Sequence, residues 1–300
     1  MRTETEIASQ PECWRRAARL LPDVAALLPA PGERVAVAGC GTSWFIAQSY
    51  AAAREAAGQG ETDAFAASEM PTGRRYDRLI VLTRSGTTTE VLRLLDQIGG
   101  VQPNVAITAD PDTPIATAAG ALITLDFADE QSVVQTRFAT TEMALLLAHL
   151  GTDLEPVAQA AERVLAAPLP DDLTQARQFT FLGTGWTTGL ASEAALKLRE
   201  AAAVWSESYP AMEFRHGPIA VTGPGSVVWM LGQPPDGLAE EVTAAGGQLF
   251  QSSEHPLAEL VRVHRVAVAL ARAAGLDPDQ PRNLTRSVIL DGAGPAQRAR

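Results

Sequence analysis

The chain has 300 residues, of which 46% are hydrophobic and 20% charged, and its formal net charge at pH 7 is -11. This balance is typical of a folded protein with a sizeable core and excludes collagen-like and disordered chains. The negative charge disfavours nucleic acid and anionic membranes as partners. Two cysteines are too few for a disulfide framework, so we expect a reducing, cytoplasmic location. We also expect no leader peptide and no membrane-spanning segment.

The first half of the chain alternates short apolar runs with helical patterns. After an N-terminal helical segment, residues 1–34, we predict a first domain over residues 35–166. Its predicted strands cover residues 35–38, 78–82, 105–108 and 121–125, and its predicted helices cover residues 44–57, a segment ending at 97, 136–149 and 154–166. Alternating strands and helices indicate a parallel sheet.

The second half repeats this plan after a linker at Pro168 and Pro170. The apolar run at residues 179–182 with its glycine loop mirrors residues 35–41, and residues 226–231 mirror residues 79–83. Helices are predicted at 238–245 and 255–274. An internal repeat of this length predicts an α/β chain with two doubly wound parallel-sheet domains in tandem, the second over residues 173–276, followed by a tail over 277–300.

Four hydroxyl side chains follow the second predicted strand within six residues: Thr83, Ser85, Thr87 and Thr88. They precede a predicted helix, whose first N–H groups carry partial positive charge, so the segment suits a phosphate group. Simple N-capping by Thr87 is the alternative, since Thr87 and the glutamate three residues later have capping-box spacing. Capping leaves the other hydroxyls without a reason, so we favour a phosphate site.

Other motifs are weaker when taken alone. The loop after the first strand has two of the glycines of a dinucleotide fingerprint, but Trp44 stands where the third is needed. Glu193, Lys197 and Glu200 share one helical face, which locally favours an exposed ladder of ion pairs. Lys197 is nevertheless the only lysine of the chain. His216 precedes a Gly-Pro pair and could face a cavity, although histidines in loops are more often surface residues. No histidines have metal-ligand spacing, so we predict no metal site.

Taken together, the motifs resemble the sugar isomerase (SIS) family, and within it the isomerase half of glucosamine-6-phosphate synthase. The similarity covers nearly the whole chain and depends on five stretches in order: Cys40-Gly41-Thr42-Ser43, Ser85-Gly86-Thr87-Thr88, residues 193–200, residues 213–218 and residues 279–284.

The resemblance implies two flavodoxin-like SIS domains, a homodimer with its sites near the subunit interface, a hexose or aminohexose phosphate as ligand, and no cofactor. The tail would complete the site. Position by position, it implies these residues for binding of the sugar phosphate: Ser43, Thr83, Arg84, Ser85, Thr88, Gln135, Thr285 and Arg286. Gln135 stands where the synthase has serine.

The resemblance also implies catalytic roles. Glu200 would be the base that moves a proton between carbon 1 and carbon 2, and Lys197 would orient Glu200 or the sugar. His216, contributed by the neighbouring subunit, would assist ring opening. A carboxylate beside an ammonium in a partly dry cleft can stay ionised and attack a carbon acid, which agrees with these roles.

Two departures from the synthase limit the reaction that we expect. The sequence reaches the SIS region within about thirty-five residues and shows no glutaminase domain, so we do not expect it to release ammonia from glutamine. Arg286 stands where the synthase has the lysine that attacks the ketose carbonyl, and arginine stays protonated and forms no imine.

Several functions remain open. The first is a phosphosugar isomerase, with amine loss or addition from free ammonia as a variant. A deglycase or deaminase that splits a fructosamine phosphate could use the same base. A sugar-phosphate sensor without catalysis is the third possibility, although such sensors usually carry a DNA-binding arm. A nicotinamide oxidoreductase is disfavoured by the incomplete glycine motif.

Overall fold

A computed structural model describes residues 1–290. Its strands form two sheets in which every pairing is parallel. The first sheet has the order β2-β1-β3-β4-β5, and the second has the order β7-β6-β8-β9. The strands are β1 (Val35–Gly39), β2 (Thr62–Ala66), β3 (Arg78–Leu82), β4 (Asn104–Thr108), β5 (Leu122–Thr124), β6 (Gln178–Gly183), β7 (Ser206–Pro210), β8 (Ser226–Leu231) and β9 (Gln248–Gln251).

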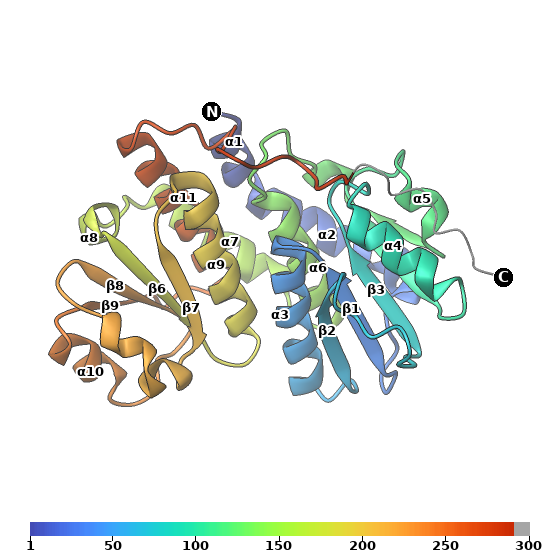
Figure 1. The fold of residues 1–300 in the computed structure, drawn as a ribbon, viewed down its shortest axis with the longest axis horizontal. Helices are drawn as coiled ribbons and strands as arrows, with labels where there is room; N and C mark the ends of the chain where they lie inside the picture. Colours follow the sequence, from blue (N-terminus) through green and yellow to red (C-terminus); the bar gives the residue numbers. More distant parts are fainter. Residues whose placement is uncertain (291–300) are drawn as a thin grey trace.

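Helices cover both faces of the sheets (Figure 1). They are α1 (Arg2–Ala8), α2 (Gln10–Val24), α3 (Thr42–Ala56), α4 (Thr89–Ile98), α5 (Ile115–Ala118), α6 (Arg137–His149), α7 (Leu154–Ala166), α8 (Asp171–Gln175), α9 (Thr187–Ala202), α10 (Leu238–Ala244) and α11 (Pro256–Ala273). Short 3-10 turns, η1 (Ala25–Leu27), η2 (Asp126–Ala128), η3 (Glu213–His216) and η4 (Pro218–Val221), complete the described chain. An α/β fold with parallel sheets, as predicted, is confirmed. No helix in residues 1–290 is both long and apolar enough to cross a membrane.

Three strands escaped the sequence prediction: β2, β7 and β9. All three lie at an edge of their sheet, where one side is open and side chains are only partly buried. Their sequences mix polar with apolar residues, as in Ser206–Pro210, so the continuous apolar run typical of a central parallel strand is missing.

One buried apolar cluster extends through both sheets. It joins Val37 and Ile80 of the first sheet to Phe181 and Trp229 of the second. Helices α3 and α9 pack against each other between the two sheets, where Figure 1 shows them side by side. Smaller clusters fill the outer faces beneath α4 and α10. The two sheets therefore share a core, although each has its own set of helices.

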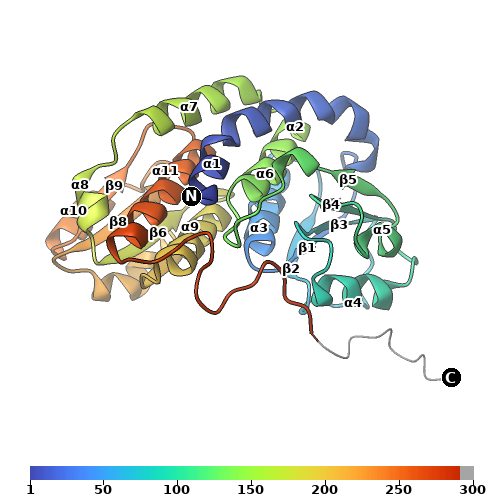
Figure 2. The ribbon, with the colours of Figure 1, turned by 90° about the horizontal axis from the view of Figure 1, so that it is seen from above.

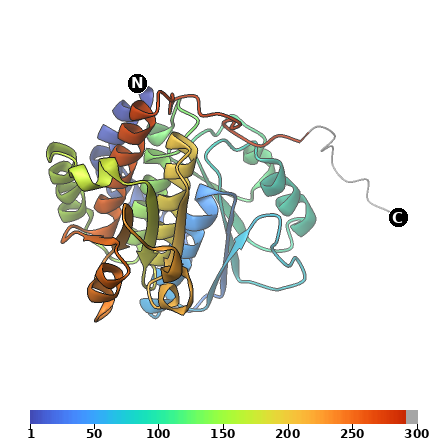
Figure 3. The ribbon, with the colours of Figure 1, turned by 60° about the vertical axis from the view of Figure 1, so that its left-hand side comes forward.

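The segment after α11 crosses from the second sheet to the first. In Figure 2 it runs from the end of α11 past α9 and reaches α4. Asp279 anchors it to the N-terminal helix α1 by accepting hydrogen bonds from Arg2 N (2.9 Å) and Thr3 N (2.8 Å). The N-terminus and this segment consequently lie at the same end of the molecule (Figure 3). We call residues 277–290 the tail.

Candidate active site

The charged face of α9 is buried, because α3 and α11 pack against the helix. Glu193 and Lys197 are 0% and 1% exposed, so the exposed ion-pair ladder favoured by local spacing is wrong. The Lys197 ammonium donates to Glu200 Oε2 (2.5 Å) and to Thr42 Oγ1 (3.0 Å), and it lies 3.4 Å from Glu193 Oε1. This ammonium therefore connects two carboxylates of α9 to the first residue of α3.

Burial and charge set the protonation of this cluster. Burial raises the pKa of Glu193 to about 7, against an opposing effect of Lys197. Burial alone would lower the pKa of Lys197, but Glu193 and Glu200 together raise it above its usual value. Glu142 of α6 is completely buried, neither of its carboxylate oxygens has a hydrogen-bond partner, and burial raises its pKa well above the usual range. Lys197 is therefore a fixed cation beside Glu193, a carboxylate whose ionisation is disfavoured by burial.

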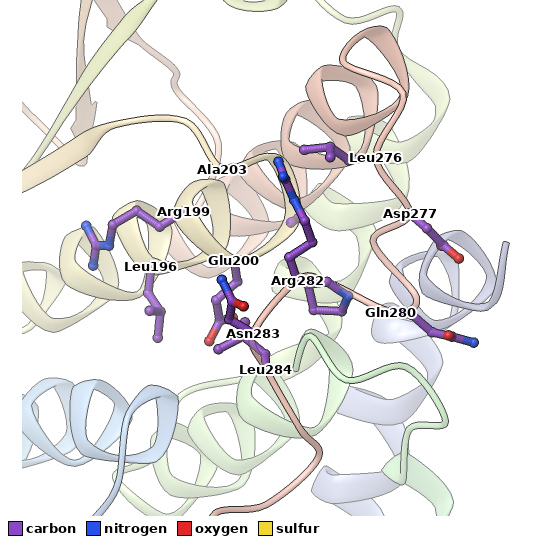
Figure 4. A pocket seen from close by; sticks show the side chains of 12 residues that line it. Leu196, Arg199, Glu200, Ala203, Leu276, Asp277, Gln280, Arg282, Asn283 and Leu284 are labelled. Atoms are coloured by element: carbon purple, nitrogen blue, oxygen red, sulfur yellow. The ribbon is translucent and has the colours of Figure 1, made fainter.

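Glu200 lines a cavity of about 420 Å³ between the end of α9 and the tail. Its side chain is 20% exposed, in contrast to its buried partner Lys197. In Figure 4, Glu200 lies beside Asn283 and Leu284 of the tail, whereas Arg199 of the same helix points away from them. Such a volume lies within the range of ligand pockets, roughly 300–1,000 Å³. Glu200 is the only one of the predicted site residues that lines this cavity.

The hydroxyl-rich loop follows β3 and begins α4. Strands β1 and β3 are neighbours in register, with Gly39 opposite Leu82, so this loop and the start of α3 lie at the same edge of the sheet. Ser43 is buried in the first turn of α3. Thr83 is also buried, and its hydroxyl has no partner. The carboxyl ends of β1 and β3 therefore carry both Thr42, the partner of Lys197, and the predicted phosphate site.

The start of α4 differs from the capping alternative. Its N-cap residue is Thr88 and not Thr87, and no side chain caps it. The hydroxyls of Ser85, Thr87 and Thr88 hydrogen-bond among themselves, with Ser85 Oγ 3.1 Å from Thr87 Oγ1 and 3.5 Å from Thr88 Oγ1. Capping by Thr87 therefore does not account for the cluster.

Arg84 lies in the same loop, but its guanidinium is engaged elsewhere. It donates to the carbonyl oxygens of Ser132 (3.2 Å) and Val133 (3.3 Å), and to that of Arg286 in the tail (2.8 Å). It also lies 3.9 Å from the buried Glu130 carboxylate. The side chain is 1% exposed, so in this arrangement it holds the tail and does not face the hydroxyl cluster.

Arg286 completes this connection. Its guanidinium donates to the carbonyl oxygen of Glu130 and pairs with the Asp129 carboxylate. Thr285 is exposed, and its hydroxyl donates to Ser287 O (2.8 Å). Gln135 is half-buried just before α6, and its Oε1 has no partner. The two arginines thus fasten the tail to the loop that precedes α6.

Ser287 lies against the predicted phosphate site, although the sequence analysis did not single it out. Its hydroxyl lies 3.1 Å from the hydroxyls of Ser85 and Thr87 and 3.3 Å from that of Thr88. No local pattern distinguishes Ser287, because it lies three residues beyond the Asp279–Leu284 motif, in a stretch with no regular secondary structure. Its position depends on a fold that joins residues 202 apart.

His216 lies far from Glu200 within one chain. It ends η3, which follows β7, and it is exposed. Because β7 runs parallel to β6, residue 216 lies at the edge of the second sheet where α9 begins, whereas Glu200 lies near the end of α9. A 16-residue helix is roughly 24 Å long, so the two side chains belong to opposite ends of it. No group of metal-binding side chains occurs in residues 1–290.

Comparisons with known proteins concern the sequence and the fold of the chain. The SIS domain model matches residues 30–150. Glutamine–fructose-6-phosphate aminotransferases from Thermosynechococcus vestitus and Caulobacter vibrioides are 27% and 26% identical to the chain; the matches cover 86% and 96% of this chain and 52% and 58% of those proteins. The chain thus spans about half the length of the curated relatives that it matches.

Solved structures share the fold over nearly the whole chain. A glucosamine-6-phosphate deaminase from Thermotoga maritima superposes with a TM-score of 0.78 and 23% identity, over 97% of this chain and 100% of that one. The C-terminal domain of the aminotransferase from Francisella tularensis also has a TM-score of 0.78, with 19% identity over 94% and 98% of the two chains. Residues 30–150 therefore match the SIS domain family, and the chain as a whole is similar to the isomerase half of the glutamine–fructose-6-phosphate aminotransferases.

Proposed function

We propose that the chain is a phosphosugar isomerase that moves a proton between carbon 1 and carbon 2 of a hexose or aminohexose phosphate. One observation carries the proposal: Glu200 lines a cavity while a buried ammonium, that of Lys197, ties it to the edge of the sheet that carries the hydroxyl loop. A carboxylate held beside a fixed cation suits a base that removes and returns a proton at a carbon next to a carbonyl.

The phosphate would bind at the start of α4, where the helix N-terminus favours an anion. Ser43, Thr83, Ser85 and Thr88 would supply hydroxyl donors, and Gln135 an amide. Arg84 would contribute through its place in the loop and through its hold on the tail, because its guanidinium is bonded to carbonyl groups. Thr285 and Arg286 would close the sugar side of the site.

Arg286 argues against synthase chemistry. The guanidinium is protonated, is bonded to Asp129 and the Glu130 carbonyl, and cannot attack a carbonyl to form an imine. Proton transfer by Glu200 needs no such lysine. We therefore assign isomerisation to this chain and not amine exchange through an imine at residue 286.

We further propose a tandem organisation. The second parallel sheet would be a second flavodoxin-like SIS domain over residues 173–276, beside the first over 35–166, with residues 1–34 as a helical segment. The C-terminal segment 277–300 would complete the site. Its residues 277–290 are the tail, and its last ten residues lie outside the described part. A homodimer would bring His216 of a second copy to Glu200. Within one chain, Glu200 lies near the end of α9, whereas His216 of η3 lies at the level where α9 begins.

A second candidate is a deaminase or deglycase acting on an aminated sugar phosphate. The structural likeness to the glucosamine-6-phosphate deaminase of Thermotoga maritima favours it. The same base would act on a substrate that already carries nitrogen. A sensor without catalysis is the remaining alternative, and the same experiment separates all three.

Proton exchange tests these functions. Fructose 6-phosphate, glucose 6-phosphate and glucosamine 6-phosphate are each incubated with the protein in deuterated water, and NMR follows the protons on carbons 1 and 2. We expect exchange with at least one of them, and a loss of about 10²–10⁴-fold in Glu200→Gln, because the base is removed. The exposed Glu240 of α10 supplies the control, and Glu240→Gln should exchange like the unaltered protein.

The reaction products, or the absence of proton exchange, distinguish the isomerase, the deaminase and the sensor. Interconversion without release of ammonia supports the isomerase, and ammonia release from glucosamine 6-phosphate supports the deaminase. If the sugars protect the protein against heat but no proton exchanges, the enzyme assignment is wrong for these sugars and the sensor replaces it.

A further inference from the structure

The tail places one oxygen at the centre of the hydroxyl loop. Ser85 Oγ and Thr87 Oγ1 each donate to Ser287 Oγ at 3.1 Å, and Thr88 Oγ1 lies 3.3 Å from the same atom. Ser287 Oγ therefore contacts three hydroxyls at once. A single oxygen of a phosphate group would make the same contacts, because it accepts hydrogen bonds and carries no proton that limits its partners.

A second tail oxygen occupies the helix N-terminus. Thr89 N, the first N–H of α4, donates to Val288 O (3.1 Å), and Leu290 N donates to Thr89 Oγ1 (3.0 Å). This N–H is one of those that an α-helix leaves without an internal partner, and it is a usual donor to a bound anion. Residues 287–290, which we call the strap, thus use both kinds of donor that a phosphate would need.

The strap is held by little else. Val288, Ile289 and Leu290 are 51%, 66% and 45% exposed, so their apolar side chains contribute little burial. Immediately before the strap, Arg286 is fixed by its carbonyl to Arg84 and by its guanidinium to Asp129. The strap can therefore leave the hydroxyl loop while the preceding residue stays in place.

The strap also explains why the cavity and the hydroxyls are separate. Leu284 lines the cavity beside Glu200, and three residues later Ser287 covers the hydroxyl cluster. None of Ser43, Thr83, Ser85 and Thr88 lines the cavity. A sugar phosphate that reaches both Glu200 and these hydroxyls needs the strap to move.

We propose that the strap is an autoinhibitory occupant of the phosphate site, which the phosphate group of the substrate displaces. The inference rests on the proposed function, because it assumes that the loop binds phosphate. It predicts that the strap and phosphate compete, so a substitution within the strap that weakens its contacts with the loop strengthens phosphate binding.

Binding of inorganic phosphate tests the competition. Isothermal titration calorimetry compares the unaltered protein with Ser287→Ala and with Ser253→Ala, an exposed serine after β9 that serves as the control. Ser287→Ala removes three hydroxyl contacts of the closed strap, and we expect the dissociation constant to fall about tenfold. Ser253→Ala should leave it unchanged. A chain that ends after Arg286 should bind at least as tightly as Ser287→Ala.

Hydrogen exchange gives an independent measure. Phosphate should increase the exchange of the Leu290 amide in the unaltered protein, because its bond to Thr89 Oγ1 is lost. Weaker phosphate binding by Ser287→Ala would make Ser287 a phosphate ligand and would overturn the inference. Equal binding in both proteins, or an unchanged Leu290 amide, would also overturn it.

A further variant separates this inference from the proposed function. Ser85→Ala removes a hydroxyl of the loop itself and should weaken phosphate binding by about fivefold or more. If neither phosphate nor the three sugar phosphates bind to any variant, including the chain that ends after Arg286, the proposed function fails. If they bind and respond to Ser85→Ala but not to Ser287→Ala, only the strap inference fails.

Discussion

Lys197 carries one positive charge but lies beside two carboxylates, those of Glu193 and Glu200. Burial raises the pKa of the Glu142 carboxyl on α6, and the charges of Glu130 and Glu193 raise it further. The structure meets this excess by keeping part of it protonated, since the pKa of Glu193 is raised by burial to about 7. Of the two carboxylates beside Lys197, only that of Glu200 lines the cavity.

The protonation of Glu193 makes stability depend on pH. Between its usual pKa of 4.5 and its raised pKa of about 7, the folded chain keeps a proton that the unfolded chain loses. The free energy of unfolding therefore falls as pH rises through this window, by up to about 3 kcal/mol from this group. Glu193→Gln removes the effect, so its stability relative to the unaltered protein should increase from pH 4.5 to pH 7 and then level off.

Denaturant unfolding at several pH values measures this difference. Glu240→Gln, at an exposed position of α10, is the control and should follow the unaltered protein. A difference between Glu193→Gln and the unaltered protein that is constant with pH would show that Glu193 is ionised throughout, contrary to its burial.

At the residue scale, the sequence predicted which residues share a helical face, but it did not predict whether that face is buried. Spacing placed Glu193, Lys197 and Glu200 on one face of a helix, which is correct. It did not reveal that α3 and α11 cover that face, because helical periodicity describes a helix and not its neighbours.

At the scale of the elements, the contact between α3 and α9 positions the side chains of the candidate site. Gly189 lets the two helices approach closely: a Cβ atom at this position would meet Phe45 O and, at 2.7 Å, Ser49 N. Two turns further along α9, Lys197 reaches Thr42 at the start of α3. The close approach of α3 and α9 near residue 189 thus supports the hydrogen bond from Lys197 to Thr42.

Gly189→Ala should therefore be destabilising, by roughly 1–3 kcal/mol from overpacking. Helix propensity alone predicts the opposite sign, since alanine is favoured over glycine in a helix by about 1 kcal/mol. Denaturant unfolding decides between them. The loop residue Gly73 has nothing within 4 Å of an added Cβ, so Gly73→Ala should change stability by less than about 0.5 kcal/mol. Stabilisation by Gly189→Ala would contradict the close approach.

Prediction of the elements succeeded where burial was complete. The central strands β1, β3, β6 and β8 are almost entirely buried and were recognised from apolar runs. The edge strands β2, β7 and β9 were missed because pairing on one side leaves room for polar residues. Of the four edge strands, only β5 was found.

For the whole molecule, the positions of Glu200 and His216 determine how a site can be assembled. Glu200 lies near the end of α9, whereas His216 lies in η3, at the level where α9 begins, so a site that uses both needs two copies of the chain. In a symmetric dimer each copy would supply Glu200 to one site and His216 to the other.

Mixing two inactive variants tests this assembly. Glu200→Gln and His216→Ala should each be inactive in proton exchange, yet dimers containing one copy of each would have one intact site. After random exchange of subunits, about a quarter of the original sites should be restored. Analytical ultracentrifugation establishes whether dimers form. Dimers whose mixture stays inactive would show that the two residues do not combine across subunits.

The sequence by itself determined the alternation of strands and helices, the hydroxyl loop, the charged face of α9 and the resemblance to the SIS family, because these are local patterns or ordered motifs. Only the tertiary structure decided that Lys197 is buried against Thr42, 155 residues away, that Ser287 covers a loop 202 residues away, and that His216 is remote from Glu200. Such contacts depend on how helices and loops pack across two sheets. Short-range periodicity does not encode that arrangement, since the same pattern is compatible with either an exposed or a covered face.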